Sequence, residues 1–140
     1  MKNHYKSASH AVFLLRLHLV FVTKYRKKCI TEAMGADLQE AFAGVLVAWR
    51  CQLLEFGHEE DHVHLLIDIH PALDISTLIN NLKSATSKRI RGKYGHYLRL
   101  FYTRNLFWNR AYFVSSVGSA TLETVRAYVE AQGKSVPPNP

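Results

Sequence analysis

Cysteine, proline and long apolar runs are scarce in this chain of 140 residues. The two cysteines, Cys29 and Cys51, are too few for a disulfide scaffold and lack the spacing of a metal-binding pair, so reduced thiols in a cytoplasmic protein are expected. The longest apolar stretch, residues 11–22, contains Arg16 and His18 and is shorter than the roughly 20 residues that span a bilayer. These shortages argue against a secreted disulfide-rich domain and against a membrane protein.

Acidic residues are scarce as well. The chain has 11 Asp and Glu against 18 Lys and Arg, which gives a net charge of +7 and a pI of about 9.6. Between Ile75 and Leu122 there is no acidic residue, whereas eight of the 18 basic residues and eight aromatic residues fall there. Basic side chains neutralise phosphates and aromatic rings stack on unpaired bases, so this composition favours a single-stranded nucleic acid as the partner.

Hydrophobic periodicity and capping residues predict strands at 12–23, 51–57, 62–69 and 106–115 and helices at 32–49, 75–93 and 119–132. Gly92 and Gly95 are expected in a loop after the second helix, and residues 133–140, with three prolines, in a flexible tail. The element order predicts an α+β, ferredoxin-like (RRM-like) split βαβ fold, in which two helices cover one face of a four-stranded antiparallel sheet. The last helix is added to this core, and residues 1–132 are expected to form a single domain.

His62 and His64 are separated by one residue in the strand expected at 62–69. Side chains two positions apart in a strand share a face, so both imidazoles project together while Val63 and Leu65 point into the core. Two imidazoles on one face make half of a metal site. The same pattern is also typical of two polar residues on the solvent face of a strand, and a third ligand is needed to decide between these interpretations.

Tyr128 and Gln132 lie one turn apart on the last predicted helix. If Leu122, Val125 and Val129 form its buried stripe, the helical period puts Tyr128 and Gln132 on one flank. A phenol and an amide oxygen would then face the same point in space. A tyrosine at the edge of a buried stripe is also typical of simple packing, with its hydroxyl in water.

Four segments of the chain together resemble the single-tyrosine HUH transposases, small enzymes of bacterial insertion sequences that act on single-stranded DNA. The segments are Leu19–Lys28, Asp61–Leu66, Trp108–Val117 and Ala120–Gln132, and they follow the family's order from about Leu14 onwards. The coupling of a His-hydrophobic-His strand to a downstream Tyr-x-x-x-Gln helix is what the family requires, which makes the resemblance specific.

The resemblance implies a transposase in which His62, His64 and Gln132 bind one divalent metal ion, Mg²⁺ first and Mn²⁺ second. It also implies that Tyr128 is the nucleophile and that His62, His64 and Tyr128 form the catalytic site. Cleavage of single-stranded DNA at hairpin-bearing transposon ends would form a 5′-phosphotyrosine, which another 3′-OH could reverse without ATP. The basic residues expected at the DNA are Lys24, Arg26, Lys27, Lys83, Lys88, Arg89, Arg91 and Lys93.

The resemblance further implies a homodimer in which the tyrosine helix of one subunit can complete the histidine site of the other. It places the protein in the cytoplasm of a bacterium or archaeon, associated with the nucleoid. The turn Ser115–Gly118 is compatible with movement of the following helix, and whether Tyr128 acts in its own subunit or in the partner is left open.

Two other functions remain open on the sequence. One is a non-catalytic module that binds single-stranded nucleic acid on the same kind of sheet. The other is a metal hydrolase built on His62, His64 and His70, with Asp68 on the histidine face.

Overall fold

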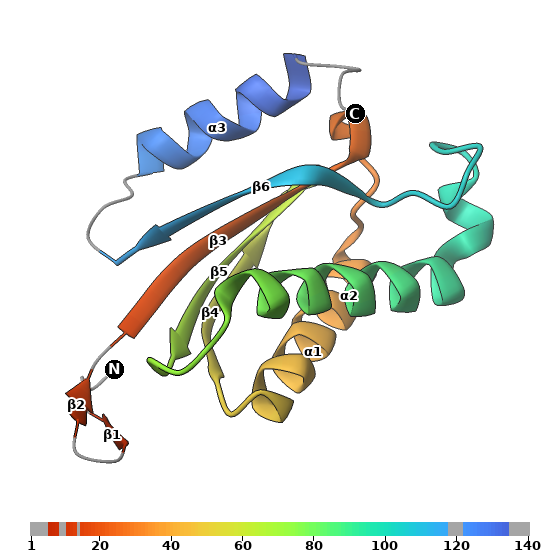
Figure 1. Ribbon diagram of the computed structural model, residues 1–140. Coiled ribbons are helices and arrows are strands. Elements are labelled where there is room, and N and C mark those ends of the chain that lie inside the picture. Colours follow the sequence, from red (N-terminus) through yellow and green to blue (C-terminus); the bar gives the residue numbers. More distant parts are fainter. Residues whose placement is uncertain (1–5, 9–10, 14, 118–121, 135–140) are drawn as a thin grey trace.

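The computed structural model describes residues 6–8, 11–13, 15–117 and 122–134, with side chains for 15–117 and 126–132. A four-stranded sheet lies at the centre, two long helices cover one of its faces, and a third helix lies against the other face (Figure 1). The elements in chain order are β1 (Lys6–Ala8), β2 (Ala11–Phe13), β3 (Leu15–Thr23), the 3-10 turn η1 (Lys24–Arg26), α1 (Glu32–Ala48), β4 (Gln52–His58), β5 (His62–Ile69), α2 (Ile75–Leu98), β6 (Trp108–Ser116) and α3 (Leu122–Lys134).

The sheet has the strand order β4-β5-β3-β6, and every neighbouring pair is antiparallel. This arrangement puts β3 and β5 in the centre, which confirms the predicted ferredoxin-like split βαβ fold. In the β3–β5 ladder Val22 pairs with His62 and Val20 pairs with His64. The end of β3, and therefore the turn η1, lies beside the two histidines.

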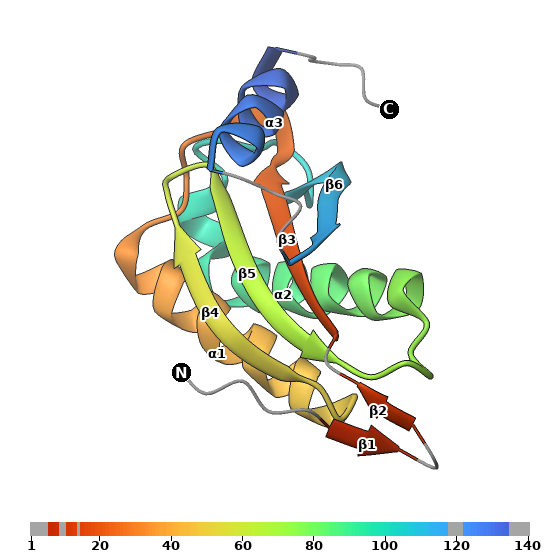
Figure 2. The same ribbon diagram turned by 90° about the vertical axis from the view of Figure 1, so that its left-hand side faces the viewer.

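Side chains along the central strands point alternately to the two faces of the sheet and form a separate apolar layer on each face. Leu19 and Phe21 of β3, like Val63 and Leu65 of β5, are almost completely buried against α1 and α2. The intervening residues Val20 and Val22 are also buried, but on the opposite face, where Val129 of α3 covers them. Figure 2 shows the sheet between the helix pair and α3. The central strand β3 is therefore buried on both faces.

Both long helices begin at side-chain caps. The Thr31 hydroxyl accepts a hydrogen bond from the Met34 amide at the start of α1, and the Asp74 carboxylate accepts one from the Thr77 amide at the start of α2. The helices then bury residues at the spacing of three and four that an amphipathic helix requires. The buried side chains are Met34, Leu38, Phe42 and Leu46 of α1 and Leu78, Ile79, Leu82, Thr86, Ile90 and Leu98 of α2.

The prediction for the end of α2 was wrong. The helix continues past Lys93 to Leu98, so Gly92 and Gly95 lie inside it rather than in a loop. Each glycine costs the helix about 1 kcal/mol relative to alanine, but burial of Leu98 favours its continuation. Between the two glycines the helix has a kink at Tyr94, whose φ of −117° and ψ of 20° are not helical. No helix in the described part of the chain is long and apolar enough to cross a membrane.

Both ends of the chain also differ from expectation. The single strand expected at 12–23 is two strands, because residues 11–13 pair with residues 6–8 in a small separate hairpin. The last helix includes Gly133 and Lys134, which were expected in the tail. The expected start of this helix at 119, the turn residue Gly118 and the tail from 135 lie outside the described residues, as do the side chains of Leu122 and Val125.

Candidate active site

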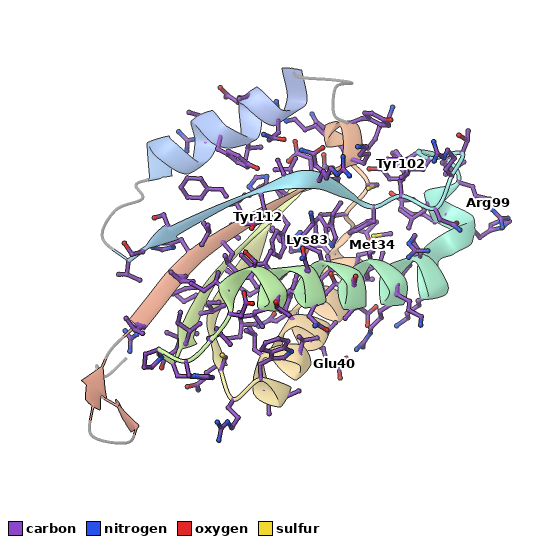
Figure 3. All side chains as sticks on the ribbon, viewed as in Figure 1. Met34, Glu40, Lys83, Arg99, Tyr102 and Tyr112 are labelled. Carbon is purple, nitrogen blue, oxygen red and sulfur yellow. The ribbon has the colours of Figure 1, made fainter. Side chains whose placement is uncertain are left out.

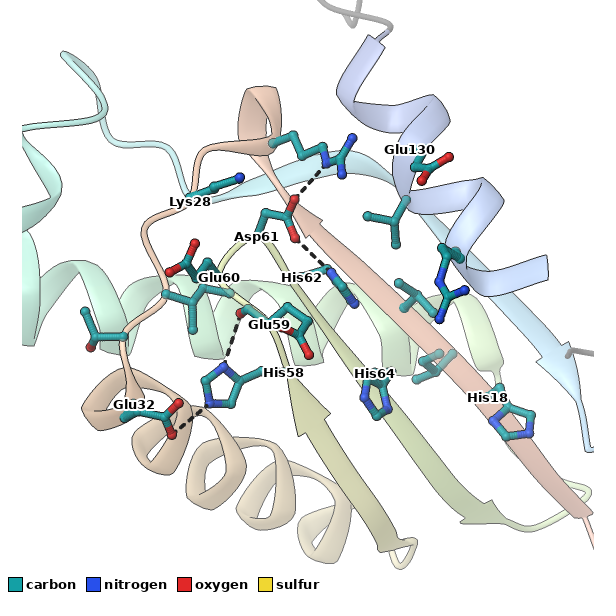
Figure 4. A pocket seen from close by; sticks show the side chains of 17 residues that line it. His18, Lys28, Glu32, His58, Glu59, Glu60, Asp61, His62, His64 and Glu130 are labelled. Atoms are coloured by element: carbon teal, nitrogen blue, oxygen red, sulfur yellow. Dashed lines mark hydrogen bonds and ion pairs between the residues drawn. The ribbon is translucent and has the colours of Figure 1, made fainter. Parts of the chain in front are cut away.

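His62 and His64 project from β5 into a pocket of about 940 Å³ on the α3 side of the sheet (Figure 4). Their ring centroids are 6.3 Å apart with an interplanar angle of 37°. Val63 and Leu65 point to the opposite face and are buried, as the alternation predicted. His18 of the neighbouring strand β3 also lines the pocket.

The carboxylate of Asp61 holds the ring of His62. Because an ionised carboxylate can only accept, Nδ1–H of His62 donates to Oδ1 of Asp61 at 2.9 Å, and Nε of Arg26 donates to Oδ2 at 2.7 Å. Burial would raise the pKa of Asp61, but the hydrogen bonds from His62 and Arg26 together hold this pKa below its ordinary value. The bond at Nδ1 leaves Nε2 of His62 with its lone pair for a metal ion.

His64 is positioned by the space beside it on the neighbouring strand. It pairs with Gly57 across β4 and β5, and its imidazole occupies the volume that a side chain on Gly57 would need. Burial is the main cause that lowers the pKa of His64, and the neighbouring His62 lowers it further. A lowered pKa favours the neutral imidazole, which is the form that binds metal.

Tyr128 does not line this pocket. Its ring packs on Phe113 of β6 with centroids 5.5 Å apart, in a cluster with Val20, Val22 and Val129. Its hydroxyl is buried without a hydrogen-bond partner among the described residues, and burial raises the pKa of Tyr128 to about 12. The phenol is therefore fully protonated at neutral pH in this position.

Gln132 faces β6 as well. Its side-chain oxygen accepts a hydrogen bond from the side-chain amide of Asn109. The residues of α3 that line the pocket are Arg126, Val129 and Glu130. The structure thus brings Tyr128 and Gln132 to one flank of α3, but this flank does not face the two histidines within one chain.

The histidine pair fits one divalent ion as part of a ligand set. Nε2 of His62 is available, the lowered pKa of His64 favours its neutral form, and the two rings line the same pocket with centroids 6.3 Å apart. Among the described residues, no group of three or more His, Cys, Asp or Glu side chains is arranged to hold a metal ion.

Most of the cations predicted to contact DNA have a partner within the chain. Arg89 forms ion pairs with Glu40 at 2.6 Å and Asp37 at 3.5 Å, and Lys93 pairs with Asp37 at 3.0 Å, so both tie α2 to α1. Arg26 pairs with Asp61, Arg91 donates to Ser87, and Lys83 donates to the Arg110 carbonyl. Lys27 and Lys88 are exposed, and Lys24 lies over the ring of Tyr25.

Several aromatic residues of the acid-free stretch 75–122 are part of the core. Tyr102, Phe107 and Trp108 are at most 8% exposed, and the Trp108 indole donates to Thr86. Tyr25, which is 45% exposed in the basic turn, is a better candidate for stacking. The local sequence Lys24–Lys28, with one aromatic among basic residues, was the available signal.

The hydrolase site on His62, His64 and His70 is ruled out by the strand geometry. His70 follows the end of β5, where Nε2 donates to the Trp49 carbonyl at 3.4 Å. Eight residues of extended strand separate it from His62 by roughly 26 Å. His70 lines a different pocket, at the other end of the sheet.

Sequence reasoning missed the roles of Asp61 and Gly57. Asp61 directly precedes His62, and strict alternation would have put its side chain on the other face of the strand. Only the turn before β5 brings its carboxylate to the imidazole. Gly57 becomes meaningful only through its register opposite His64.

Known transposases are similar in sequence to most of this chain. Residues 11–132 match the protein family described as Transposase IS200 like. The transposase for insertion sequence element IS200 of Salmonella typhimurium is 30% identical over 132 residues, which cover 91% of this chain and 82% of that protein. The ISDra2 transposase TnpA of Deinococcus radiodurans is 26% identical over 121 residues, 86% of each protein.

Solved structures share the fold. The crystal structure of a candidate transposase from Deinococcus radiodurans superposes with a TM-score of 0.84 at 25% identity, over 91% of this chain and 97% of that chain. A REP-associated tyrosine transposase bound to a REP hairpin superposes with a TM-score of 0.55 at 9% identity, over 89% and 69% of the two chains, and shows likeness of fold alone. The family match and the shared fold show that this chain belongs to the IS200-like transposases, the single-tyrosine HUH transposase family.

Proposed function

We propose that this transposase cuts and rejoins single-stranded DNA at hairpin-bearing transposon ends through a 5′-phosphotyrosine on Tyr128. The observation that carries the proposal is the pair His62 and His64, which share one face of β5 and line an open pocket. Residues 1–132 would act as one domain, and His62, His64 and Gln132 would hold one divalent ion, Mg²⁺ or Mn²⁺. When bound, this ion offsets the charge on a non-bridging phosphate oxygen and so favours attack on phosphorus.

The reaction is a transesterification that runs in both directions. The Tyr128 oxygen attacks phosphorus, the bond from phosphorus to the 3′-oxygen breaks, and the released 3′-oxygen gains a proton to balance the one that the phenol loses. The 5′-phosphotyrosine keeps the energy of the broken ester. A 3′-OH from another DNA end then attacks the same phosphorus, and Tyr128 leaves as a phenol. ATP is not required because one ester replaces another.

Tyr128 must reach the histidines before it can react. Its packing on Phe113 and its raised pKa describe a resting position, because a protonated phenol in an apolar cluster is a weak nucleophile. We infer that α3 supplies Tyr128 and Gln132 to a histidine pair after a shift of the helix or from the second subunit of a homodimer. The hydrogen bond between Asn109 and Gln132 would break in this step.

The basic turn beside the pocket, residues Lys24–Lys28, is the proposed contact with DNA. Lys28 lines the pocket, Lys27 is exposed next to it, and Tyr25 is exposed on the same turn. The REP-associated relative was solved with a DNA hairpin, which supports a hairpin as the ligand here. Phosphate contacts by these cations would hold the strand while the histidine pocket receives the scissile phosphate.

A covalent adduct tests the proposal. The protein is incubated with Mg²⁺ and hairpin-bearing single strands from the DNA that flanks its gene, and adducts are separated on denaturing gels. The native protein should form an adduct that chelation prevents, Tyr128→Phe should form none, and the matched Tyr97→Phe should behave as the native protein. An adduct of equal yield with Tyr128→Phe would falsify the assignment of the nucleophile.

A non-catalytic module that binds single-stranded DNA is the second candidate, and the position of Tyr128 outside the pocket favours it. Such a module predicts DNA binding that is insensitive to chelation and no adduct under any condition. His62→Ala separates the two functions. For the transposase it should abolish the adduct and leave most of the DNA affinity, since affinity depends on many phosphate contacts.

A further inference from the structure

Asp61 connects the basic turn to the predicted metal ligand. Its side chain is 8% exposed, and each of its two carboxylate oxygens has its own donor, Nδ1 of His62 and Nε of Arg26 (Figure 4). A buried carboxylate bound at both oxygens has a fixed orientation, and it therefore fixes the ring that it holds.

The backbone around Asp61 is fixed as well. The Asp61 carbonyl accepts a hydrogen bond from the Thr23 amide at 2.9 Å, which ties the end of β3 to the start of β5. The residues that follow β3 form η1, and the carbonyl of Lys24 in this turn accepts a hydrogen bond from the Tyr102 hydroxyl at 2.7 Å. Backbone and side-chain hydrogen bonds thus join Asp61 to the turn.

The turn adopts a costly conformation that brings Arg26 to Asp61. Tyr25 and Arg26 have positive φ values of 59° and 54°, in the left-handed region that residues with a Cβ rarely adopt. Such strain persists only where the surrounding structure imposes it. Here the hydrogen bonds to Thr23 and Tyr102 impose it, and the guanidinium of Arg26 points back to Asp61 instead of out to solvent.

We propose that Asp61 and Arg26 are positioning residues that prepare His62 to bind the divalent ion, an inference that rests on the proposed function. Asp61 accepts the hydrogen bond from Nδ1–H of His62, and in the neutral imidazole this tautomer leaves the lone pair on Nε2. Arg26 occupies the second carboxylate oxygen and prevents Asp61 from rotating away from His62. Arg26 therefore acts on the metal site through Asp61, whereas its exposed neighbour Lys27 would act on DNA alone.

Metal binding without DNA provides the test. Titration of the purified full chain with Mn²⁺ should show about 10- to 100-fold weaker binding for Asp61→Ala and Arg26→Gln than for the native protein. Asp61→Asn provides a second variant that preserves volume if Asp61→Ala fails to fold. Lys27→Gln, one residue from Arg26 and exposed, is the matched control and should bind Mn²⁺ as the native protein does.

Nitrogen NMR of the metal-free protein gives a second readout. His62 should carry its proton on Nδ1 in the native protein and in Lys27→Gln, and should become a mixture of tautomers in Asp61→Ala. The salt dependence of DNA affinity should distinguish Lys27 from Arg26 in the opposite way. Lys27→Gln should reduce the slope of log affinity against log salt concentration by about one phosphate contact, and Arg26→Gln should leave this slope unchanged.

The outcomes separate this inference from the proposed function. A native Mn²⁺ affinity in Asp61→Ala, or a native His62 with its proton on Nε2, overturns the positioning role alone. Absence of Mn²⁺ binding by the native protein overturns both the metal role and this inference. Absence of a Tyr128 adduct with normal Mn²⁺ binding overturns only the proposed reaction, because neither metal titration nor the His62 tautomer involves Tyr128.

Discussion

The imidazole of His64 lies over the backbone of Gly57, its partner across the β4–β5 ladder. A Cβ at position 57 would overlap the Cε1 and Nε2 atoms of the ring. One of the two predicted histidine ligands therefore depends on the absence of a side chain on the neighbouring strand.

Gly57→Ala should displace His64 and reduce the rate of adduct formation by about 100-fold, the cost of a misplacement of about 1 Å. The expected cause is a moved ligand, so Mn²⁺ titration should also show weaker binding. Gly44→Ala is the control, since no atom lies within 4 Å of the new Cβ on the surface of α1. It should retain full activity and stabilise the helix by about 1 kcal/mol in urea unfolding. Native activity in Gly57→Ala would contradict the proposed packing.

Tyr128→Phe should leave the protein as stable as the native chain or up to about 1 kcal/mol more stable, because it removes a buried hydroxyl that has no partner among the described residues. Tyr102→Phe is the matched comparison. The Tyr102 hydroxyl donates to the Lys24 carbonyl, and removal of this hydroxyl should lower the free energy of unfolding by about 1 to 2 kcal/mol. Urea unfolding measures both. An equal loss in the two variants would show that Tyr128 has a partner in solution, such as a group of a second subunit.

Lys83 should make stability depend on alkaline pH. It packs beneath β6 near Tyr112 (Figure 3), and burial, together with Lys24 and Arg110, lowers its pKa from 10.5 to about 8. Between pH 8 and 10.5 the unfolded chain then binds more protons than the folded chain, so native stability rises with pH. Below pH 8 both states are protonated, and the full cost of burying the charge is present.

Lys83→Met removes this cost. Its stability relative to the native protein should be most favourable below pH 8 and should decline as the pH rises to 10.5. Thermal unfolding across this range measures the difference, and the exposed Lys88→Met is the control with a constant difference. A constant difference for Lys83→Met as well would show that the amine is not buried in solution.

Asp37→Asn should loosen the contact between α1 and α2. The pKa of Asp37 lies below its ordinary value of 3.8, mainly because Tyr94 donates a hydrogen bond to the carboxylate and also because Lys93 donates one. The ionised carboxylate therefore stabilises the folded protein at pH values above 3.8. The variant should unfold at a lower temperature near neutral pH. Its deficit should disappear as the pH falls through the lowered pKa. Glu32→Gln, whose side chain is 98% exposed, should show no comparable deficit, and an equal one would point to overall charge instead.

The sequence alone determined most of the helices and strands along the chain, the capping residues that begin the two long helices, and the shared face of His62 and His64. Each of these follows from local rules, namely the period of two in a strand, the period of 3.6 in a helix and the hydrogen-bonding capacity of capping residues such as Thr31. The end of α2 was predicted wrongly, because the local preference of Gly95 favours a loop whereas Leu98 is buried by residues distant in sequence. The ion pairs of Arg89 could not be predicted from local rules either, because its acidic partners lie on another helix.

Only the tertiary structure decided which groups the histidines meet. The helical period placed Tyr128 and Gln132 on one flank of α3, but the direction of that flank depends on how the helix docks on β3 and β6. The link from Arg26 through Asp61 to His62 depends on a left-handed turn, and the space for His64 depends on the register of β4. Periodicity describes each element about its own axis, and these contacts require the relative position of two elements, which only packing of the whole chain defines.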